Sequence, residues 1–535
     1  MPIDHAYLNS LRDQADFGSA DSITVHGVEI DIPISTPGPR SWQRRVLPDL
    51  VPDYPLADAS EKILYDIERT LTVPEQSEKT VPEALAGAMS PLVPLFYAQT
   101  TLKTGVPVAF HVTAVKTPER LKCRTLKEHT LLLLCRDEEG RLDEPLLTEF
   151  LERFRTGKDE LDLAQRAFVD AVSPSFDPDT HALPTLDGHR TAARPFLPLQ
   201  GALFRRDLRT LLDVPYVASE FFRLSNLLIA IHFGLFQPRL ALALNPAIRA
   251  LLDELSEPNS VNVAELETVE QGQHPSSDFT GWIHMRAPDL GETRPLSTTA
   301  PERESYREMQ SQLAELHFSI LLLNRARELT RAYLTNRGWP DDSAIDEACQ
   351  YPSQLINRLR TDGEYRRFFD LASAALAARF TSDQLDADQQ PAGARAIDEA
   401  ASGLAGLREV YILHNIQPPA KPWKTRAVKS GMEVTDGVLA RGEYGIISNR
   451  NRVGKYFELG TGLLPLLLLL VIGSGKSKTS VYDWWEGLER YGFSFAPAER
   501  ALLLRRLQSM GLYERFSDAG EANYIYNLMM PERSK

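Results

Sequence analysis

The sequence predicts a mainly α-helical, multi-domain protein with a small α+β unit at its N-terminus, a helical middle and a C-terminal winged helix-turn-helix. Three observations lead to this prediction. Strand-like alternation occurs in the first 140 residues, helical spacing of apolar residues begins near residue 144, and three short helical segments followed by a hairpin pattern close the chain. A length of 535 residues is enough for about two to four domains.

The composition is that of a globular protein, with 43% hydrophobic and 25% charged residues. Only three cysteines occur, and none has CxxC spacing, which excludes a disulfide scaffold or a thiolate zinc cluster. The first ten residues lack a signal-peptide pattern. The most apolar run, Leu463 to Ile472, is far shorter than the ~20 residues that span a bilayer. We therefore expect a cytoplasmic protein without a membrane partner.

The net charge of −14 is unevenly distributed along the chain. Residues 401–535 contain 18 Lys and Arg against 13 Asp and Glu, a charge of +5, which leaves −19 on the first 400 residues. An acidic body repels a phosphate backbone, whereas a basic tail tolerates or attracts one. Acidic surfaces also favour solubility, and this explanation accounts for the uneven charge distribution equally well.

The N-terminal unit, residues 1–140, contains the strand signals. Residues 23–34 alternate around His26-Gly27 as in a short hairpin, and residues 106–116 and 129–136 are further strand candidates. If the protein were an enzyme, His111, His129 and Cys123 of this unit would be its candidate groups. Buried core histidines and cysteines explain them as well, so we expect no catalytic residues.

Helical patterns fill the middle of the chain. We predict one helical domain over 141–256, with helices at 199–212, 219–235 and 240–255, and a polar linker over 257–300. A second helical domain over 301–416 is predicted to contain helices at 302–337, 343–361, 364–378 and 394–414. No fixed-period repeat is evident, so the pattern does not indicate a solenoid.

A basic connector, 417–455, precedes a predicted winged helix-turn-helix at 456–535. Its helices are expected at 462–472, 481–490 and 496–510, with Thr479 or Ser480 as the cap of the second and Pro497 in the first turn of the third. Gly511 ends the third helix. Residues 512–516 and 522–528 flank an Asp/Gly turn and are predicted to be the two strands of the wing.

In a DNA-binding winged helix, the third helix enters the major groove and the wing contacts the backbone. The expected contacts to double-stranded DNA are the basic and polar groups of the connector, third helix and wing: Lys421, Lys424, Arg426, Arg450, Arg452, Lys455, Arg500, Arg505, Arg506, Gln508 and Arg515. Negative charges at Glu499, Glu514, Asp518 and Glu521 favour the alternative, a module that docks to another protein.

Several other motifs do not meet the requirements of the sites they resemble. Gly473-Ser-Gly-Lys-Ser477 resembles the end of a phosphate-binding loop, but Leu470 stands where its first glycine belongs and the preceding segment is helical. His274, Asp278 and His284 lack short metal-ligand spacing. We therefore expect neither a cofactor nor a metal.

Residues 450–462 and 512–524 resemble the C-terminal ends of accessory, non-ATPase subunits of bacterial anti-phage restriction islands. The G subunit of phosphorothioation-dependent restriction is the most similar type, and the resemblance covers roughly 80 residues. It implies a non-catalytic, DNA-engaging subunit that works beside an ATPase or helicase in antiviral defence or DNA processing. The competing hypothesis from a different class is a kleisin-like scaffold whose winged helix caps an ATPase partner.

Overall fold

The structure is a computed structural model. It describes residues 22–31, 98–99, 105–106, a few positions between 135 and 153, 197–270 except 217, 282–289, 294–339, 342–415, 435, 439–440, 445–450, 454–515 and 523–528. Helices dominate these residues, and the few sheets are small, so the chain is mainly α-helical as predicted.

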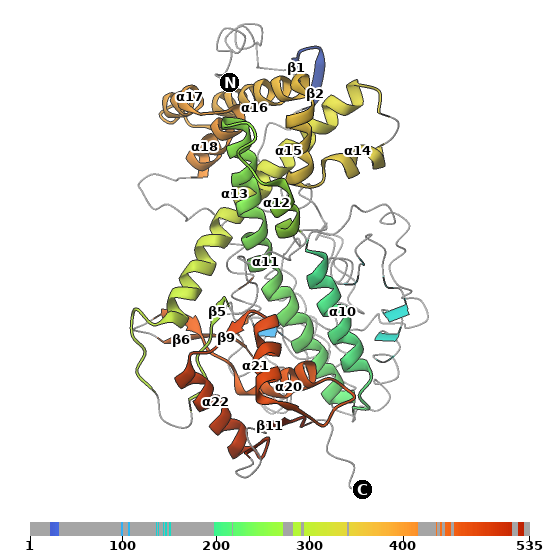
Figure 1. The fold of residues 1–535 in the computed structure, drawn as a ribbon. Coiled ribbons are helices and arrows are strands. Elements are labelled where there is room, and N and C mark those ends of the chain that lie inside the picture. The colour runs from blue at the N-terminus through green and yellow to red at the C-terminus, as the bar shows by residue number, and fades with distance from the viewer. Residues whose placement is uncertain are drawn as a thin grey trace, which may run out of the picture.

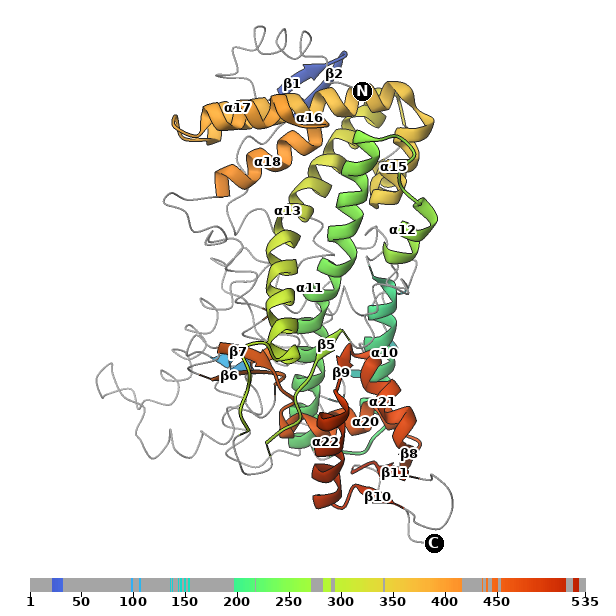
Figure 2. The ribbon, with the colours of Figure 1, turned by 60° about the vertical axis from the view of Figure 1, so that its left-hand side comes forward.

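Two long helices form the axis of the molecule. α11 (Ala218–Ser256) and α13 (Pro301–Asn336) lie side by side and run in the same direction (Figures 1 and 2). Asn245 of α11 donates its side-chain amide to the Gln312 carbonyl at 2.9 Å, and the Ser319 hydroxyl donates to Asn245 Oδ1 at 2.8 Å. α10 (Pro198–Leu212) packs beside α11.

α11 continues through two prolines, Pro238 and Pro246, where the sequence predicted two separate helices, 219–235 and 240–255. A proline inside a helix removes a backbone hydrogen bond and costs ~3 kcal/mol or more. Burial on both sides of the junction offsets that cost, because Phe236 is 2% exposed and Leu240 is fully buried. Tertiary packing therefore overrides the local signal to break the helix.

At one end of the axis, shorter helices form a separate layer (Figures 1 and 2). They are α12 (Val263–Glu270), α14 (Asp342–Cys349), α15 (Pro352–Thr361), α16 (Gly363–Gln384), α17 (Gln390–Glu399) and α18 (Gly403–Asn415). The hairpin of β1 (Ser22–Val25) and β2 (Val28–Asp31), which turns at His26-Gly27 as predicted, contacts α16 and α13. β3 (Ala98–Gln99) pairs with β4 (Gly105–Val106).

The C-terminal elements lie at the other end of the axis. β6 (Ile447–Arg450) and β7 (Gly454–Phe457) form a hairpin, and the 3-10 turn Thr461–Leu463 leads into α20 (Leu464–Ile472). α21 (Val481–Arg490) and α22 (Pro497–Ser509) follow. The three antiparallel strands β8 (Lys478–Ser480), β10 (Tyr513–Arg515) and β11 (Asn523–Tyr526) pair in the order β10-β11-β8.

The three C-terminal helices therefore lie within two residues of their predicted bounds. Ser480 caps α21, with the Asp483 amide donating to its hydroxyl at 3.0 Å. In the middle of the chain, the predicted helix 343–361 is divided at Pro352 into α14 and α15, and 394–414 corresponds to α17 and α18. The predicted linker 257–300 contains α12 and the short strand β5 (Ile283–His284).

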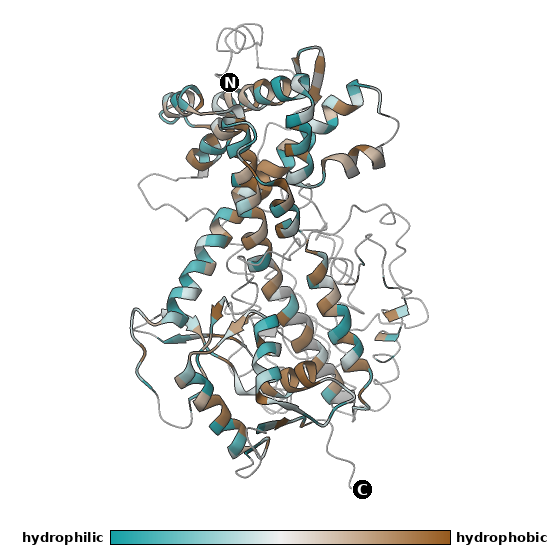
Figure 3. Ribbon diagram, in the orientation of Figure 1, coloured by the Kyte–Doolittle hydropathy of each residue, from teal (hydrophilic) through white to brown (hydrophobic). Residues whose placement is uncertain are grey.

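One continuous cluster of buried apolar residues extends from the β1–β2 hairpin to Ile525 in β11. α20 is almost wholly apolar (Figure 3) and packs against both α10 and α11. None of the helices in the described ranges is long and apolar enough to cross a membrane.

Candidate nucleic-acid interface

The C-terminal elements contribute their own buried side chains to the continuous apolar core of the molecule. Trp484 and Leu488 of α21, Leu503 and Leu507 of α22, and Ile525 of β11 are fully buried. Gly511, with a φ of +72°, ends α22 in the left-handed conformation that glycine adopts without strain. One face of α22 packs on this core through Leu503 and Leu507, and the opposite face lies on the molecular surface.

That face is a stripe of residues spaced by three or four positions, which we call the α22 stripe: Ala498, Ala501, Leu502, Arg505, Gln508 and Ser509. Leu502 is half-buried and the others are exposed. Arg505 is the only charged residue of the stripe, and Gln508 lies one turn further along the helix. The stripe therefore presents small side chains at its N-terminal half and hydrogen-bond donors at its C-terminal half.

The other predicted residues of α22 have different environments. The Arg500 guanidinium donates to Glu489 and to the Phe495 carbonyl, both at 3.0 Å, and lies 5.1 Å from the Trp485 ring. Arg506 is half-buried, and its Nε atom has no hydrogen-bond partner among the described residues. Arg500 is thus bound to Glu489 of α21, whereas Arg506 has a buried Nε atom.

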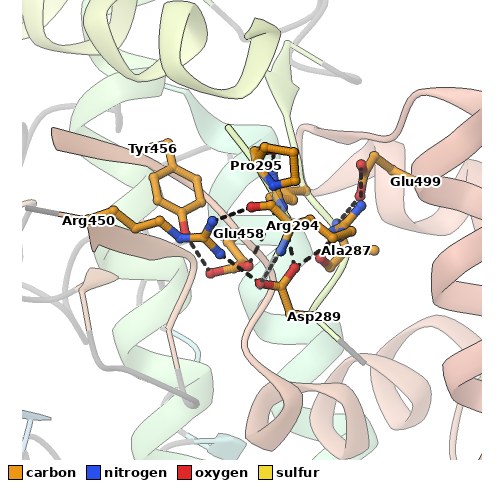
Figure 4. Close-up of polar contacts among 9 residues, drawn as sticks. Ala287, Asp289, Arg294, Pro295, Arg450, Tyr456, Glu458 and Glu499 are labelled. Carbon is orange, nitrogen blue, oxygen red and sulfur yellow. Dashed lines mark hydrogen bonds and ion pairs between the residues drawn. The ribbon is translucent and has the colours of Figure 1, made fainter. Parts of the chain in front are cut away.

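Arg450 lies in a network of ion pairs and hydrogen bonds (Figure 4). Its guanidinium donates to Asp289 at 2.7 Å and to the Arg294 carbonyl at 2.6 Å. Burial alone would raise the pKa of Asp289, but hydrogen bonds from Arg294 and the charge of Arg286 hold it below its ordinary value. Arg450 therefore joins β6 to Asp289 and Arg294.

The same network holds α22 in place. Arg294 donates to Glu499 at 2.7 Å, and the Ala287 amide donates to the second oxygen of Glu499, also at 2.7 Å (Figure 4). Glu499, whose negative charge weighed against DNA binding in the sequence, is therefore paired with an arginine. Its charge does not project from the α22 stripe.

Of the remaining predicted residues, Arg515 is exposed on β10 beside the exposed Glu514, and Lys455 is half-buried on β7. The other four, Lys421, Lys424, Arg426 and Arg452, lie outside the described residues, as do His111, His129 and Cys123. The structure thus places Arg505, Gln508 and Arg515 on the surface, whereas Arg450 is bound to Asp289.

The outer face of the small sheet carries a cluster that sequence reasoning missed. Lys478 of β8 lies 4.8 Å from the Tyr524 ring and 5.7 Å from the Tyr526 ring. Tyr524 and Tyr526 alternate with the buried Ile525, so both point to the side of the sheet away from the core. The alternation of residues 524–526 predicts that the two tyrosines share a face. Only the pairing of β8 with β11 shows that Lys478 lies on the same face.

A buried polar network fixes the module to α10 and α11. The Tyr491 hydroxyl donates to Asp207 at 2.6 Å, and His232 Nε2 lies 2.8 Å from the same carboxylate oxygen. Burial lowers the pKa of His232 and raises that of Tyr491. Arg206 completes the network with a bond to Asp207 at 2.7 Å.

Backbone contacts add to this attachment. β5 pairs in parallel with β9 (Phe493–Ser494), where the Ile283 amide donates to the Gly492 carbonyl at 2.8 Å and the Met285 amide to that of Ser494 at 2.7 Å. Ser474 donates to Asp213 at the end of α10, at 2.9 Å. The module is thus held on several sides, which fixes the direction in which the α22 stripe faces.

The glycine-rich turn after α20 has the backbone of a helix end. Gly473 has a φ of +92°, a helix precedes it, and strand β8 follows Lys476 where a phosphate-binding loop would begin a helix. Within the described ranges, no group of three or more His, Cys, Asp or Glu side chains is placed to hold a metal ion. His284, one of the residues considered as a metal ligand, instead contacts the Ser494 hydroxyl through Nδ1 at 2.9 Å.

No model of a known protein family matches the chain, and no curated protein is significantly similar to it in sequence.

Proposed function

We propose that this chain is a non-catalytic accessory subunit that engages double-stranded DNA through a C-terminal winged helix-turn-helix. The observation that carries the proposal is the exposed α22 stripe on a module with the strand order β10-β11-β8. In a winged helix, the third helix is the one that lies against the major groove, and the hairpin after it reaches the backbone.

The side chains of the stripe suggest how the duplex is held. Ala498 and Ala501 allow a close approach of the helix, and Arg505 and Gln508 supply donors to phosphates or base edges. Arg515 is exposed on β10, and we infer that it contacts the DNA backbone. Arg450 and Arg500 are not part of this contact set, because both are bound to carboxylates of the chain itself.

Binding of the full-length protein to a fluorescent duplex, measured by anisotropy at low ionic strength, tests the proposal. Arg505→Ala should weaken binding by about tenfold and reduce the salt dependence. Arg395→Ala is the matched control, since Arg395 is an exposed arginine on α17 at the opposite end of the molecule. No binding by the wild type, or equal losses in the two variants, contradicts the proposal.

A second candidate function, docking to another protein, is favoured by the charge balance of the same module. Asp483 and Glu486 on α21 and Glu514 on β10 are exposed on the same module, and Tyr482 on α21 is 76% exposed. Aromatic residues are enriched in protein interfaces relative to the rest of the surface. Co-purification of a partner that survives nuclease treatment and is lost in Tyr482→Ala would favour docking over DNA binding.

The cellular setting we propose is a prokaryotic anti-phage defence or DNA-processing complex in the cytoplasm, in which an ATPase or helicase does the mechanical work. The resemblance of residues 450–462 and 512–524 to accessory subunits of such systems supports this. ATP hydrolysis by the purified complex should depend on the partner and not on this chain. Retained ATP hydrolysis by this chain alone would contradict an accessory role.

A further inference from the structure

A groove is lined by residues of α11, of α12 and of the turn between them. Both helices are seen in Figure 2, where α12 lies at a distance from the C-terminal module. Its volume is about 830 Å³. Apolar residues form the floor: Leu242, Pro246, Ala250, Val261, Leu266 and Val269. Leu242 and Ser256 mark its extent along α11, which corresponds to about 21 Å at 1.5 Å per residue.

The rim of the groove is acidic. Asp253, Glu257 and Glu265 are exposed lining residues, and the one basic lining residue, Arg249, lies 3.4 Å from Glu315 of α13. Pro246 adds a polar feature to the floor, because it has no N–H to donate to the Leu242 carbonyl four residues earlier. The groove therefore combines an apolar floor with negative charge at its edge.

The turn between α11 and α12 is fixed in shape. Glu254, whose side chain is fully buried, accepts the Asn259 amide at 2.8 Å and the Arg360 guanidinium at 2.6 Å. Arg360 also donates to the Val261 carbonyl at 2.6 Å. The wall formed by residues 259–269 is thus held against α11 by residues of α15, so the groove exists before any partner arrives.

We propose that this groove binds a basic amphipathic helix of a partner protein. A helix of about four turns matches the length of the groove, its apolar side covers the floor, and its Lys or Arg residues meet the acidic rim. The site is separate from the proposed DNA contact and gives the chain a second attachment point within an assembly.

Isothermal titration of the full-length protein with two synthetic peptides tests this proposal. One is a leucine–lysine amphipathic helix of about 18 residues, which exceeds the groove length at 1.5 Å per residue, and the other has glutamate in place of lysine. The lysine peptide should bind and the glutamate peptide should not. Absence of binding by the lysine peptide, or equal binding of both, overturns the proposal.

Variants locate the binding. Asp253→Asn with Glu257→Gln should weaken binding of the lysine peptide by about tenfold. Asp388→Asn with Glu399→Gln is the control pair. It removes the same charge from two exposed positions, one just before α17 and one at its end, and should leave peptide binding unchanged. Equal losses in both pairs would indicate general electrostatic attraction and overturn the proposal.

Ala250→Trp places a large side chain on the half-buried floor and should abolish peptide binding while circular dichroism stays unchanged. The same variant distinguishes a second copy of the chain as the occupant. If the wild type self-associates in sedimentation experiments and Ala250→Trp makes it monomeric, the groove is a homomeric interface and the partner-helix proposal is wrong.

Discussion

Glu270 is a carboxyl group buried at the end of α12, with only 3% of the residue exposed. Its two oxygens accept the Ser353 amide at 2.8 Å and the Ser353 hydroxyl at 2.5 Å. Burial outweighs these bonds and raises the pKa of Glu270 from 4.5 to about 8. The folded protein therefore retains a proton on Glu270 that the unfolded chain releases at neutral pH.

This difference predicts a pH-dependent stability. Because the folded pKa is above the unfolded one, the stabilisation is present below about pH 4.5 and is lost as the pH rises towards about 8. Glu270→Gln keeps the hydrogen-bonding shape and does not titrate. Between about pH 5.5 and about pH 7.5, the wild type should lose more unfolding free energy than Glu270→Gln, by up to ~1.4 kcal/mol per pH unit.

Urea unfolding of both proteins at the two pH values measures this difference. His232 acts in the opposite direction, since burial lowers its pKa and its stabilisation is lost as the pH falls below about 6.5. That contribution is common to the wild type and Glu270→Gln, so it cancels in the comparison. Parallel pH profiles for the two proteins would show that Glu270 is not protonated in the fold.

At the scale of elements, the crossing of α20 and α21 depends on one glycine. A methyl group added at Gly487 would lie 2.3 Å from Val471 Cγ1, which is far inside van der Waals contact. Val471 is β-branched and has little freedom to move its side chain. The helices can therefore approach this closely only with glycine at position 487.

Gly487→Ala should lower the free energy of unfolding by about 1–3 kcal/mol, the usual cost of overpacking. Gly475→Ala is the matched control, because a methyl group there meets nothing within 4 Å. That variant should be neutral or slightly stabilising. Thermal denaturation compares the two, and equal melting temperatures would mean that α20 and α21 do not cross as closely as described.

Element type and position follow well from local patterns in this chain. Ser480, Pro497 and Gly511 mark helix boundaries through capping and backbone geometry, and the structure places the boundaries at or beside them. The continuous α11 could not be predicted in this way, because Pro238 is a local stop signal. Only burial of its neighbours, which depends on distant residues, outweighs it.

At the scale of the whole molecule, the C-terminal module and the long helices share one buried core. Tyr491 is one of the polar connections between them, since its buried hydroxyl donates to Asp207 of α10 and accepts from Arg206 at 3.1 Å. The position of the α22 stripe relative to the axis of the molecule depends on this attachment.

Tyr491→Phe should therefore destabilise the fold by about 1.5–3 kcal/mol, the value of a hydrogen bond to a charged group. It should also speed hydrogen exchange at the amides of Ile283 and Met285, which pair with the neighbouring strand β9. Tyr482→Phe, at a 76% exposed position, is the control and should change neither. Unchanged exchange in Tyr491→Phe would show that the module is held without this network.

The candidate site could be predicted only in part, because the partners of its arginines are far away in the sequence. The sequence identifies Arg450, Arg500 and Arg505 as cations of a basic tail, but it does not show which carboxylates lie near them. Arg450 meets Asp289, 161 residues away, whereas Arg505 is left on the surface. The distinction between a structural and a binding arginine thus depends on long-range contacts.

We propose that the α22 stripe contacts duplex DNA, and site-specific photo-crosslinking can detect this contact. A benzophenone amino acid at Ala501, in the middle of the stripe, should form a covalent adduct with a bound duplex in the full-length protein. The same probe at Asp388, next to the distant α17, should form none. A crosslink from position 501 to another protein, or no adduct under conditions in which the duplex is bound, would contradict the claim.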